Sequence, residues 1–280
     1  MRLEFTKMQG LGNDFVVIDA TREPFVASAA QIAGLADRRY GVGCDQLLVV
    51  EPAGDADCDF DYRIYNADGS EVGQCGNGAR CLARFIHERG LSTARQLRVR
   101  TRSARMTLSL LDDGQVRVNM GVPEFDPAKI PFDAPAVAPH YCLTVDNAAP
   151  LQIGAVSMGN PHAVIAVDDL QRAPVEAIGA ALQRHPAFAE QVNVGFLQVL
   201  DSGHGRLRVY ERGAGETMAC GSGACAAAVI GRLWGHFDNR VRLDLRGGSL
   251  LLEWEGEGQP VWMTGAAVTV YRGEIEWPPA

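Results

Sequence analysis

The sequence has very little lysine and no basic tract. Only two of its 26 basic residues are lysines, at positions 7 and 129, and the arginines are scattered along a chain of net charge −8. Nucleic-acid-binding proteins concentrate positive charge on one surface, so we expect no nucleic-acid partner. Enzymes that use pyridoxal phosphate hold it through a lysine Schiff base. Neither lysine lies in a repeated motif, which argues against that cofactor.

Long apolar runs are also missing. No run approaches the roughly 18–20 residues that cross a bilayer, and the first residues, with Arg2, Glu4 and Lys7, lack the apolar core of a signal peptide. The cysteines number seven. An odd number without a secretory signal indicates free thiols in a reducing compartment. We therefore expect a cytoplasmic protein with no membrane partner.

Several common catalytic signatures are absent. The chain has no Gly-x-Ser-x-Gly elbow, no P-loop and no Cys-x-x-Cys spacing, so we expect no metal. Residues 221–226 match the dinucleotide fingerprint Gly-x-Gly-x-x-Ala. That pattern alone is weak, and no clear ribose-binding acid follows it. A dinucleotide-binding protein and a dithiol redox protein stay open as alternatives.

What the sequence does contain is a duplicated motif. Cys-Gly-Asn-Gly-Ala begins at Cys75, and Cys-Gly-Ser-Gly-Ala begins at Cys220. When residues 71–83 are aligned with residues 216–228, six of the thirteen positions are identical. One long period of this kind indicates two homologous domains rather than a solenoid.

Further landmarks recur in the same order. Gly12-Asn13 precedes an apolar run in the first half, and Gly159-Asn160 precedes one in the second, at an offset of 147 residues. At the same offset Gln46 corresponds to Asn193, and near the cysteines Asn66 corresponds to Glu211. Similarity in a fixed order supports a duplicated fold.

The expected secondary structure is mainly short strands with few helices. Strands are expected where β-branched or aromatic segments are bounded by turn residues. Helices are expected over Ser28–Ala36 and Val175–Gln183, and after each repeated cysteine. The helix over Ala224–Trp234 is apolar on nearly every side, which indicates burial. We therefore predict an α+β (mixed α/β) fold of two pseudo-symmetric duplicated domains, each a small β-barrel-like sheet around a central helix, with the proline-rich stretch 123–139 as the linker.

Each repeated cysteine precedes a helix, where unpaired backbone N–H groups favour negative charge. This placement can lower the pKa of a thiol from about 8.5 to roughly 3.5–7.5, so we expect Cys75 and Cys220 to be reactive. The N–H groups of Gly76-Asn77 and Gly221-Ser222 can hold a carboxylate. Two thiols facing one amino acid would remove a proton from one side and return one to the other. The remaining cysteines are interpreted as buried and inert: Cys44, Cys58, Cys81, Cys142 and Cys225.

Polar residues at the other landmarks are candidates for contacts with the thiols or with a ligand. His162 and Glu211 are candidates for tuning the thiols, and Arg212 is suited to bind a second, distant carboxylate. Recurrence at equivalent positions favours ligand contacts over simple turn roles for the amide side chains. These are Asn13, Gln46, Asn66, Asn77, Asn160 and Asn193.

In this order the motifs resemble those of the diaminopimelate epimerase family over nearly the whole chain. An ordered set of this size is highly specific. The motifs are Gly12-Asn13-Asp14-Phe15, Gly43-Cys44-Asp45-Gln46, residues 66–70, residues 75–81, Gly159-Asn160-Pro161-His162, Asn193, Glu211-Arg212-Gly213 and residues 217–223.

The resemblance implies an enzyme without a cofactor that interconverts LL- and meso-diaminopimelate, for lysine and peptidoglycan precursors. It implies a homodimer, an active site in the cleft between the two domains of a chain, and a C-terminal segment that returns to the first domain. The domains are then expected at residues 1–120 plus 267–280, with Cys75, and at residues 121–266, with Cys220.

The resemblance also implies roles for individual residues. Cys75 and Cys220 are the thiolate base and the thiol acid, and His162 and Glu211 modulate their pKa. A related racemase of proline or hydroxyproline is a second interpretation, although the asparagines and Arg212 favour a substrate with a distal polar head. The matching substrate contacts are Asn13, Gln46, Asn66, Gly76, Asn77, Asn160, Asn193, Glu211, Arg212, Gly221 and Ser222.

Overall fold

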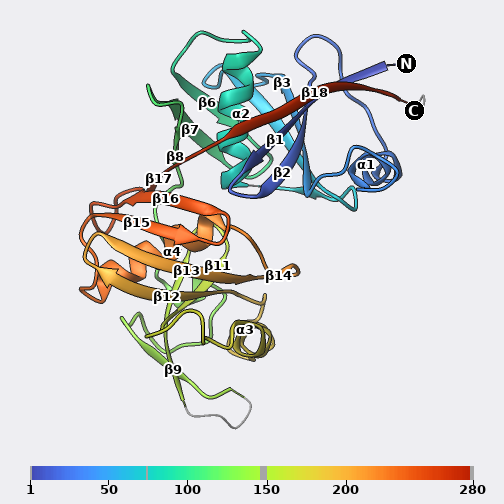
Figure 1. Cartoon of the computed structure of the whole chain (residues 1–280). Helices are drawn as coiled ribbons and strands as arrows, with labels where there is room; N and C mark the ends of the chain where they lie inside the picture. The colour runs from blue at the N-terminus through green and yellow to red at the C-terminus, as the bar shows by residue number, and fades with distance from the viewer. Residues whose placement is uncertain (1, 74, 146–149, 278–280) are drawn as a thin grey trace. The chain divides into compact units, whose positions relative to one another are not determined.

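The computed structural model describes residues 2–73, 75–145 and 150–277, and the chain divides into two compact units (Figure 1). Unit 1 comprises the chain up to Val118 together with the segment from Gly265 onward, and unit 2 comprises Asn119–Thr264. The limits expected from the sequence for the two repeat domains, at residues 120 and 266, stay a prediction.

Unit 1 contains nine strands and two helices among its described residues. Its last strand, β18, pairs antiparallel with its first, β1, so the chain returns to this unit. The strands are β1 (Arg2–Gly10), β2 (Asn13–Asp19), β3 (Gln46–Pro52), β4 (Phe60–Asn66), β5 (Glu71–Val72), β6 (Gln96–Arg100), β7 (Arg105–Leu110), β8 (Val116–Asn119) and β18 (Val268–Glu276), and the helices are α1 (Ala29–Ala36) and α2 (Gly76–Glu88).

Unit 2 has a similar content. Its strands are β9 (Tyr141–Leu143), β10 (Leu151–Ser157), β11 (Pro161–Ala166), β12 (Asn193–Asp201), β13 (His204–Glu211), β14 (Gly215–Glu216), β15 (Arg240–Leu245), β16 (Gly248–Glu253) and β17 (Trp262–Gly265). Its helices are α3 (Val175–Gln183), α4 (Gly221–Leu233) and the short 3-10 helix η1 (Pro127–Lys129).

The two units share one strand order. In unit 1, β1 pairs antiparallel with β2, β2 parallel with β3, β3 antiparallel with β4, and β4 parallel with β6. In unit 2, β10, β11, β12, β13 and β15 repeat these pairings in the same sense. Phe15 lies opposite Gln46, and His162 lies opposite Asn193, so the register repeats at the offset found in the sequence. The mixed α/β class and the duplication are thereby confirmed.

A helix is enclosed by the sheet of each unit. Helix α2 packs against β1, β2, β3, β7 and β18, and helix α4 packs against β10 to β13, β15 and β16 (Figure 1). Within α4 all residues from Gly223 to Gly231 are buried, as the all-round apolar sequence predicted. Both helices begin directly after a repeated cysteine, so the sheet fixes where each cysteine lies.

Local signals in the sequence mark several helix ends. Ser28 caps α1 and forms a capping box with Gln31. Gly90 follows α2 with a φ of 67°, the left-handed conformation that commonly ends a helix. Helix α3 spans the residues expected from the sequence.

The proline-rich stretch 123–139 is not a linker, so that expectation was wrong. Glu124 forms a β-bridge with Ser157 of β10, and Ile130 and Phe132 are buried in the core of unit 2. The Phe132 ring stacks on Phe188 at a centroid distance of 4.6 Å. Proline removes backbone donors and so limits regular structure, but it leaves neighbouring side chains free to pack in a core.

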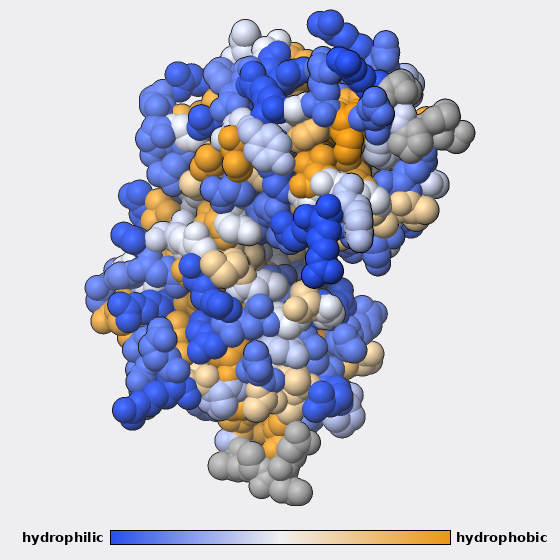
Figure 2. Space-filling view, turned by 45° about the vertical axis from the view of Figure 1, so that its right-hand side comes forward, coloured by the Kyte–Doolittle hydropathy of each residue, from blue (hydrophilic) through white to orange (hydrophobic). Residues whose placement is uncertain are grey.

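Hydrophilic residues cover most of the molecular face in Figure 2, and apolar residues reach this face in smaller patches. Within the described part of the chain, no helix is both long enough and apolar enough to cross a membrane.

Candidate functional site

Cys75 occupies the N-cap position of α2. Its backbone is extended, with φ −149° and ψ 110°, and its sulfur accepts a hydrogen bond from the Gly78 N–H at 3.4 Å. The thiol is partly exposed and lies 3.9 Å from Oδ1 of Asn13, which can accept its proton. The cysteine thus has a backbone donor on one side and an amide oxygen on the other.

The Asn13 amide is linked to the interior of unit 1. Its Oδ1 accepts from Nδ2 of Asn77 at 3.3 Å, and Oδ1 of Asn77 accepts from the Arg80 guanidinium at 3.0 Å. Arg80 is fully buried and also donates to the backbone oxygen of Ala266. The Asn77 side chain is itself buried, so its backbone N–H, rather than its amide group, is the group suited to meet a ligand.

Gln46 and Asn66 form a second amide pair in unit 1. They lie opposite each other on β3 and β4, and Nε2 of Gln46 donates to Oδ1 of Asn66 at 3.0 Å. Asn66 in turn donates to the Ser70 hydroxyl at 3.1 Å. Both amides are partly exposed at the ends of their strands, which leaves them accessible for ligand contacts.

Cys220 occupies the same position at the start of α4. Its φ of −114° and ψ of 110° resemble those of Cys75, and its sulfur accepts from the Gly223 N–H at 3.3 Å. Its Sγ lies 3.6 Å from the hydroxyl oxygen of Ser222. The duplicated motif therefore builds the same sulfur-capped helix start twice.

The expected lowering of the thiol pKa by the helix start is wrong for Cys220. Burial raises the pKa of Cys220 well above its usual range, and the neighbouring Glu211 charge raises it further. The Ser222 hydroxyl and the Gly223 N–H act in the opposite direction but are outweighed. Glu211 also accepts a hydrogen bond from the Thr217 hydroxyl. Cys220 therefore holds its proton at neutral pH.

His162 is a buried, neutral imidazole. Only 1% of its surface is exposed, and burial, with a contribution from the Arg212 charge, lowers its pKa to about 3. Its Nε2 lies 3.0 Å from Oδ1 of Asn160. A neutral ring that faces a carbonyl oxygen donates through Nε2–H, so His162 anchors Asn160 by its oxygen.

Asn193 is engaged within the protein at both ends of its side chain. Its Nδ2 donates to the backbone oxygen of Pro161 at 3.0 Å, and its Oδ1 accepts from the Arg212 N–H at 2.9 Å. Asn193 is buried, and these contacts position the backbone of Arg212. The Arg212 side chain is exposed and donates to the Glu190 backbone oxygen.

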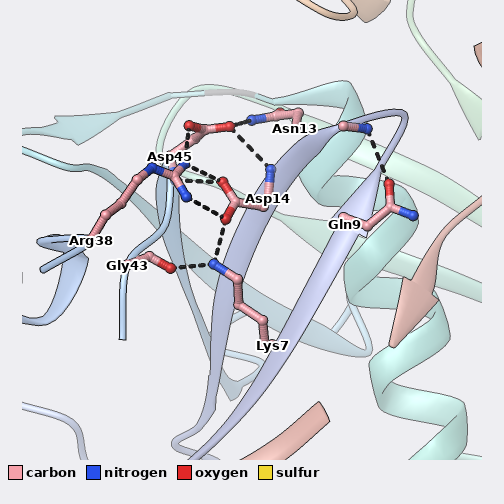
Figure 3. A network of polar contacts seen from close by, with 8 residues as sticks. Lys7, Gln9, Asn13, Asp14, Arg38, Gly43 and Asp45 are labelled. Carbon is pink, nitrogen blue, oxygen red and sulfur yellow. Dashed lines mark hydrogen bonds and ion pairs between the residues drawn. The ribbon is translucent and has the colours of Figure 1, made fainter. Parts of the chain in front are cut away.

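A charged cluster behind Asn13 was not singled out by the sequence reasoning (Figure 3). The buried Lys7 side chain donates to Asp14 and to the Gly43 backbone oxygen. Arg38 donates to both oxygens of Asp14, at 3.0 and 2.6 Å, and to Asp45 at 2.7 Å. A usable signal was present in the sequence, because these charges occur in only one copy of the duplication.

All seven cysteines are free. Burial raises the pKa of Cys44 to about 11 and that of Cys81 to about 12, as suits inert side chains. Cys142 is exposed, against expectation, because it lies on the short strand β9. No group of three or more histidine, cysteine, aspartate or glutamate residues in the described ranges could hold a metal ion.

The fingerprint at residues 221–226 lacks the setting that dinucleotide binding requires. The Gly-x-Gly-x-x-Ala pattern is expected to follow a strand of a parallel sheet and to open a helix. Here it follows β14, a two-residue strand paired antiparallel with β13, and the Gly223 N–H within it donates to the Cys220 sulfur that caps α4.

Comparison with known proteins finds similar sequences over nearly the whole chain. The family model described as diaminopimelate epimerase matches residues 5–125 and 154–270. Proteins named diaminopimelate epimerase from Nitrosospira multiformis and from Azoarcus sp. are 55% and 57% identical to this chain over 276 and 280 residues. Each alignment covers 99% of this chain and 99% or 100% of the relative.

Solved structures share the fold at much lower identity. A hydroxyproline epimerase from Agrobacterium vitis superposes with a TM-score of 0.70 at 14% identity, covering 98% of this chain and 92% of the other. A structure described as a predicted epimerase from Pseudomonas aeruginosa gives 0.68 at 18% identity, with coverage of 98% and 99%. At these identities the likeness concerns the duplicated fold alone.

Proposed function

Because this chain belongs to the diaminopimelate epimerase family, we propose that Cys75 and Cys220 invert the α-carbon of LL-diaminopimelate by a two-base reaction. The chain is an isomerase, an amino-acid epimerase whose product is meso-diaminopimelate, a precursor of lysine and peptidoglycan. The observation that carries the mechanism is the placement of two cysteines at equivalent N-cap positions of duplicated units.

In the proposed reaction one cysteine is a thiolate and the other a thiol. The thiolate takes the α-proton, and the C–H electron pair stays on the α-carbon. The thiol of the other cysteine then delivers its proton to the opposite face of that carbon, so the two sulfurs exchange protonation states. Because Cys220 is buried beside Glu211 and holds its proton, it is the acid when Cys75 is the base.

The helix starts supply the stabilisation of charge. The backbone N–H groups of Gly76-Asn77 and Gly221-Ser222 lie in the first turns of α2 and α4, where the helix dipole favours an anion. A substrate carboxylate held there gains stabilisation as negative charge develops on the adjacent carbon. The exposed Arg212 guanidinium is suited to the distal carboxylate.

The remaining substrate contacts are proposed from the geometry of each half. Asn13, Gln46 and Asn66 present amide groups at strand ends in unit 1, and Asn160 does so in unit 2. Asn193 supports Arg212 through the backbone. Glu211 tunes the Cys220 thiol directly through its charge, whereas Nε2 of His162 faces the Asn160 side chain.

The test is isotope exchange in deuterated water. The reduced protein is incubated with LL-diaminopimelate, and the product is analysed by chiral chromatography and mass spectrometry. We expect meso product that carries deuterium at one α-carbon. Cys75→Ala and Cys220→Ala should each abolish epimerisation, whereas Cys142→Ala, which removes an exposed thiol, should not. Absence of both meso product and deuterium, or full activity of either alanine variant, would contradict the mechanism.

Substrate choice is tested with a panel that includes proline and hydroxyproline. We expect turnover of diaminopimelate and none of the cyclic amino acids, because Arg212 has no distal carboxylate to bind in them. Faster turnover of a cyclic substrate would assign the chain to a different specificity.

We also propose that the enzyme is a cytoplasmic homodimer. Strand β18 is an edge strand that pairs with β1 on one side, and Val268, Val270 and Tyr271 on it are exposed. Edge strands with exposed apolar side chains favour pairing with another chain. Sedimentation should give a dimer for the wild type and a monomer for Val270→Glu, and a monomeric wild type would exclude this state.

A further inference from the structure

The two units hold the equivalent asparagines Asn13 and Asn160 by different chemical means. We propose that Asp45 is a positioning residue for the reaction, whose carboxylate holds the Asn13 amide with its carbonyl oxygen directed at Cys75. The inference rests on the proposed function of Cys75 as a catalytic thiol.

The orientation of Asn13 is fixed by charges of opposite sign at the two ends of a hydrogen-bonded chain. At one end the Asp45 carboxylate can only accept, so it must face Nδ2 of Asn13, at 3.0 Å. At the other end the buried Arg80 guanidinium can only donate, so it must face Oδ1 of Asn77. Asn77 is then left with Nδ2 directed at Oδ1 of Asn13. Both constraints give the same orientation of Asn13.

The Asp45 carboxylate is itself held in place (Figure 3). Its Oδ2 accepts from the Asp14 backbone N–H at 3.1 Å, and its Oδ1 accepts from Arg38 at 2.7 Å. The Asp45 N–H donates back to Oδ1 of Asp14 at 3.0 Å. Lys7 completes the cluster through Asp14, so two cations balance two anions and no charge is left unpaired.

This cluster belongs to unit 1 alone. Uncharged or weakly basic residues replace all four charged residues. The offset of 147 that relates the parallel strand pairs matches Asp14, Arg38 and Asp45 with Pro161, His185 and Val192. Lys7 corresponds to Ala155, because Lys7 pairs with Val16 and Ala155 pairs with Ala163, the counterpart of Val16.

In unit 2 the equivalent Asn160 is held by its carbonyl oxygen instead of by its amide nitrogen. Nε2 of His162 faces Oδ1 of Asn160, whereas Asp45 faces Nδ2 of Asn13. The contact with Asp45 therefore leaves the Oδ1 end of Asn13 for other partners, and the contact with His162 leaves the Nδ2 end of Asn160. Both units have an asparagine at this position, but the end of the amide that is held within the protein differs between them.

The polarity matters for the Cys75 sulfur. Oδ1 of Asn13, 3.9 Å from Sγ, can accept the thiol proton but gives no support to a thiolate. An Asn13 amide turned over would place an N–H donor beside the same sulfur and so favour the thiolate. The two orientations have almost the same shape, so the hydrogen-bond partners Asp45 and Asn77 decide between them.

The test measures the thiol directly. Cys75 is alkylated with iodoacetamide between pH 6 and 10, and the reaction is followed by mass spectrometry on the tryptic peptide 64–80, which contains no other cysteine. In Asp45→Asn the partner can donate as well as accept, so one of the two contacts that fix the Asn13 amide is lost, the contact with Asn77 alone remains, and the turned orientation becomes more populated. We expect the pH midpoint of alkylation to fall by about half a unit, which makes the reaction roughly threefold faster below the midpoint.

Loss of the Asp45 charge alone would act in the same direction, so the measurement is repeated in 0.5 M KCl. Salt screens a distant charge but not a hydrogen bond to the sulfur, and we expect the shift to persist. Asp61→Asn is the matched control, because Asp61 is also bonded to an arginine, Arg100, in unit 1. It should leave both the midpoint and the activity unchanged.

Two other groups that interact with Cys75 do not interfere. Burial raises the pKa of Tyr62 far above its usual range and that of Cys81 to about 12, so both stay neutral over the titration. Asp45→Ser, a smaller neutral variant, should shift the midpoint in the same direction and serves if Asp45→Asn does not fold, as judged by circular dichroism.

An unchanged midpoint in the folded variants, or a shift that disappears in salt, would overturn the role of Asp45 even where the wild type epimerises normally. Failure of the wild type to epimerise would instead count against the proposed function, and the alkylation result would still stand.

Discussion

At the scale of the residue, Glu211 shows how one side chain distinguishes two copies of the same motif. Cys75 and Cys220 cap their helices in the same way, but Glu211 stands where unit 1 has Asn66. A carboxylate beside a buried sulfur opposes formation of a second negative charge, whereas an amide carries no charge to do so. At this position of the duplication, therefore, only unit 2 has a charged side chain beside its cysteine.

Glu211→Gln should lower the pH midpoint for alkylation of Cys220 by roughly one unit, because it removes a charge that raises the pKa of this thiol. The rate with iodoacetamide is followed from pH 7 to 11, and fragment spectra separate Cys220 from Cys225 in the shared peptide. Glu255→Gln, at an exposed residue bonded to Asn239, is the control. An unchanged midpoint in Glu211→Gln would show that burial alone holds the proton.

The sequence identified the two cysteines but not their state. The repeated glycines mark a helix start, and a helix start favours a thiolate. Two effects raise the pKa of Cys220 instead, namely burial and the charge of Glu211, which is nine residues away along the chain. The cluster of Lys7, Asp14, Arg38 and Asp45 was missed for a similar reason. Its members converge only through the pairing of strands and loops.

At the scale of the element, the sulfur-capped helices α2 and α4 separate structure from chemistry. Each sulfur accepts a backbone N–H three residues on, as a serine or aspartate N-cap does. The cap needs only an acceptor, while the reaction needs an acid or base of suitable pKa. A substitution that keeps the hydrogen-bond acceptor and removes the acid or base distinguishes the two roles.

Cys220→Ser should keep the thermal midpoint of unfolding within a few degrees of the wild type, because the hydroxyl oxygen can accept from the Gly223 N–H. Cys220→Ala removes the acceptor and should lower the free energy of unfolding by about 1 kcal/mol. Both variants should lose epimerase activity. Circular dichroism melts and an activity assay check this, with Cys142→Ala as the control. Equal stability of the serine and alanine variants would mean that the cap contributes nothing.

Elements with local signals were predicted well, and those defined by packing were not. The Ser28 capping box and Gly90 mark helix ends through residues that are close together in the sequence. The stretch 123–139 was misread because its prolines indicate irregular backbone, not a boundary. Burial of Ile130 and Phe132 depends on Phe188 and other residues far along the chain, which no local pattern reports.

At the scale of the whole molecule, the two units share a strand order but bury different titratable groups. In unit 1 burial alone would raise the pKa of Asp14, but hydrogen bonds from Arg38 and Lys7 hold it well below its usual range. The stabilisation by Asp14 is therefore present above about pH 3.9 and is lost only under more acidic conditions. In unit 2 the pKa of His162 is lowered to about 3. The unfolded chain binds this proton near pH 6.5, so the stability is lost as pH falls from 6.5 toward 3.

Unit 2 should therefore loosen at a higher pH than unit 1. A buried histidine held neutral reduces the free energy of unfolding by about 1.4 kcal/mol per pH unit below 6.5, or about 2 kcal/mol by pH 5. Hydrogen exchange corrected for intrinsic rates should show roughly a thirtyfold loss of protection in β10 to β13 between pH 7 and 5, and much less in β1 to β4. His162→Gln should abolish the difference, whereas His236→Gln, at an exposed position, should preserve it. Equal loss of protection in both units would mean that the acid response does not originate at His162.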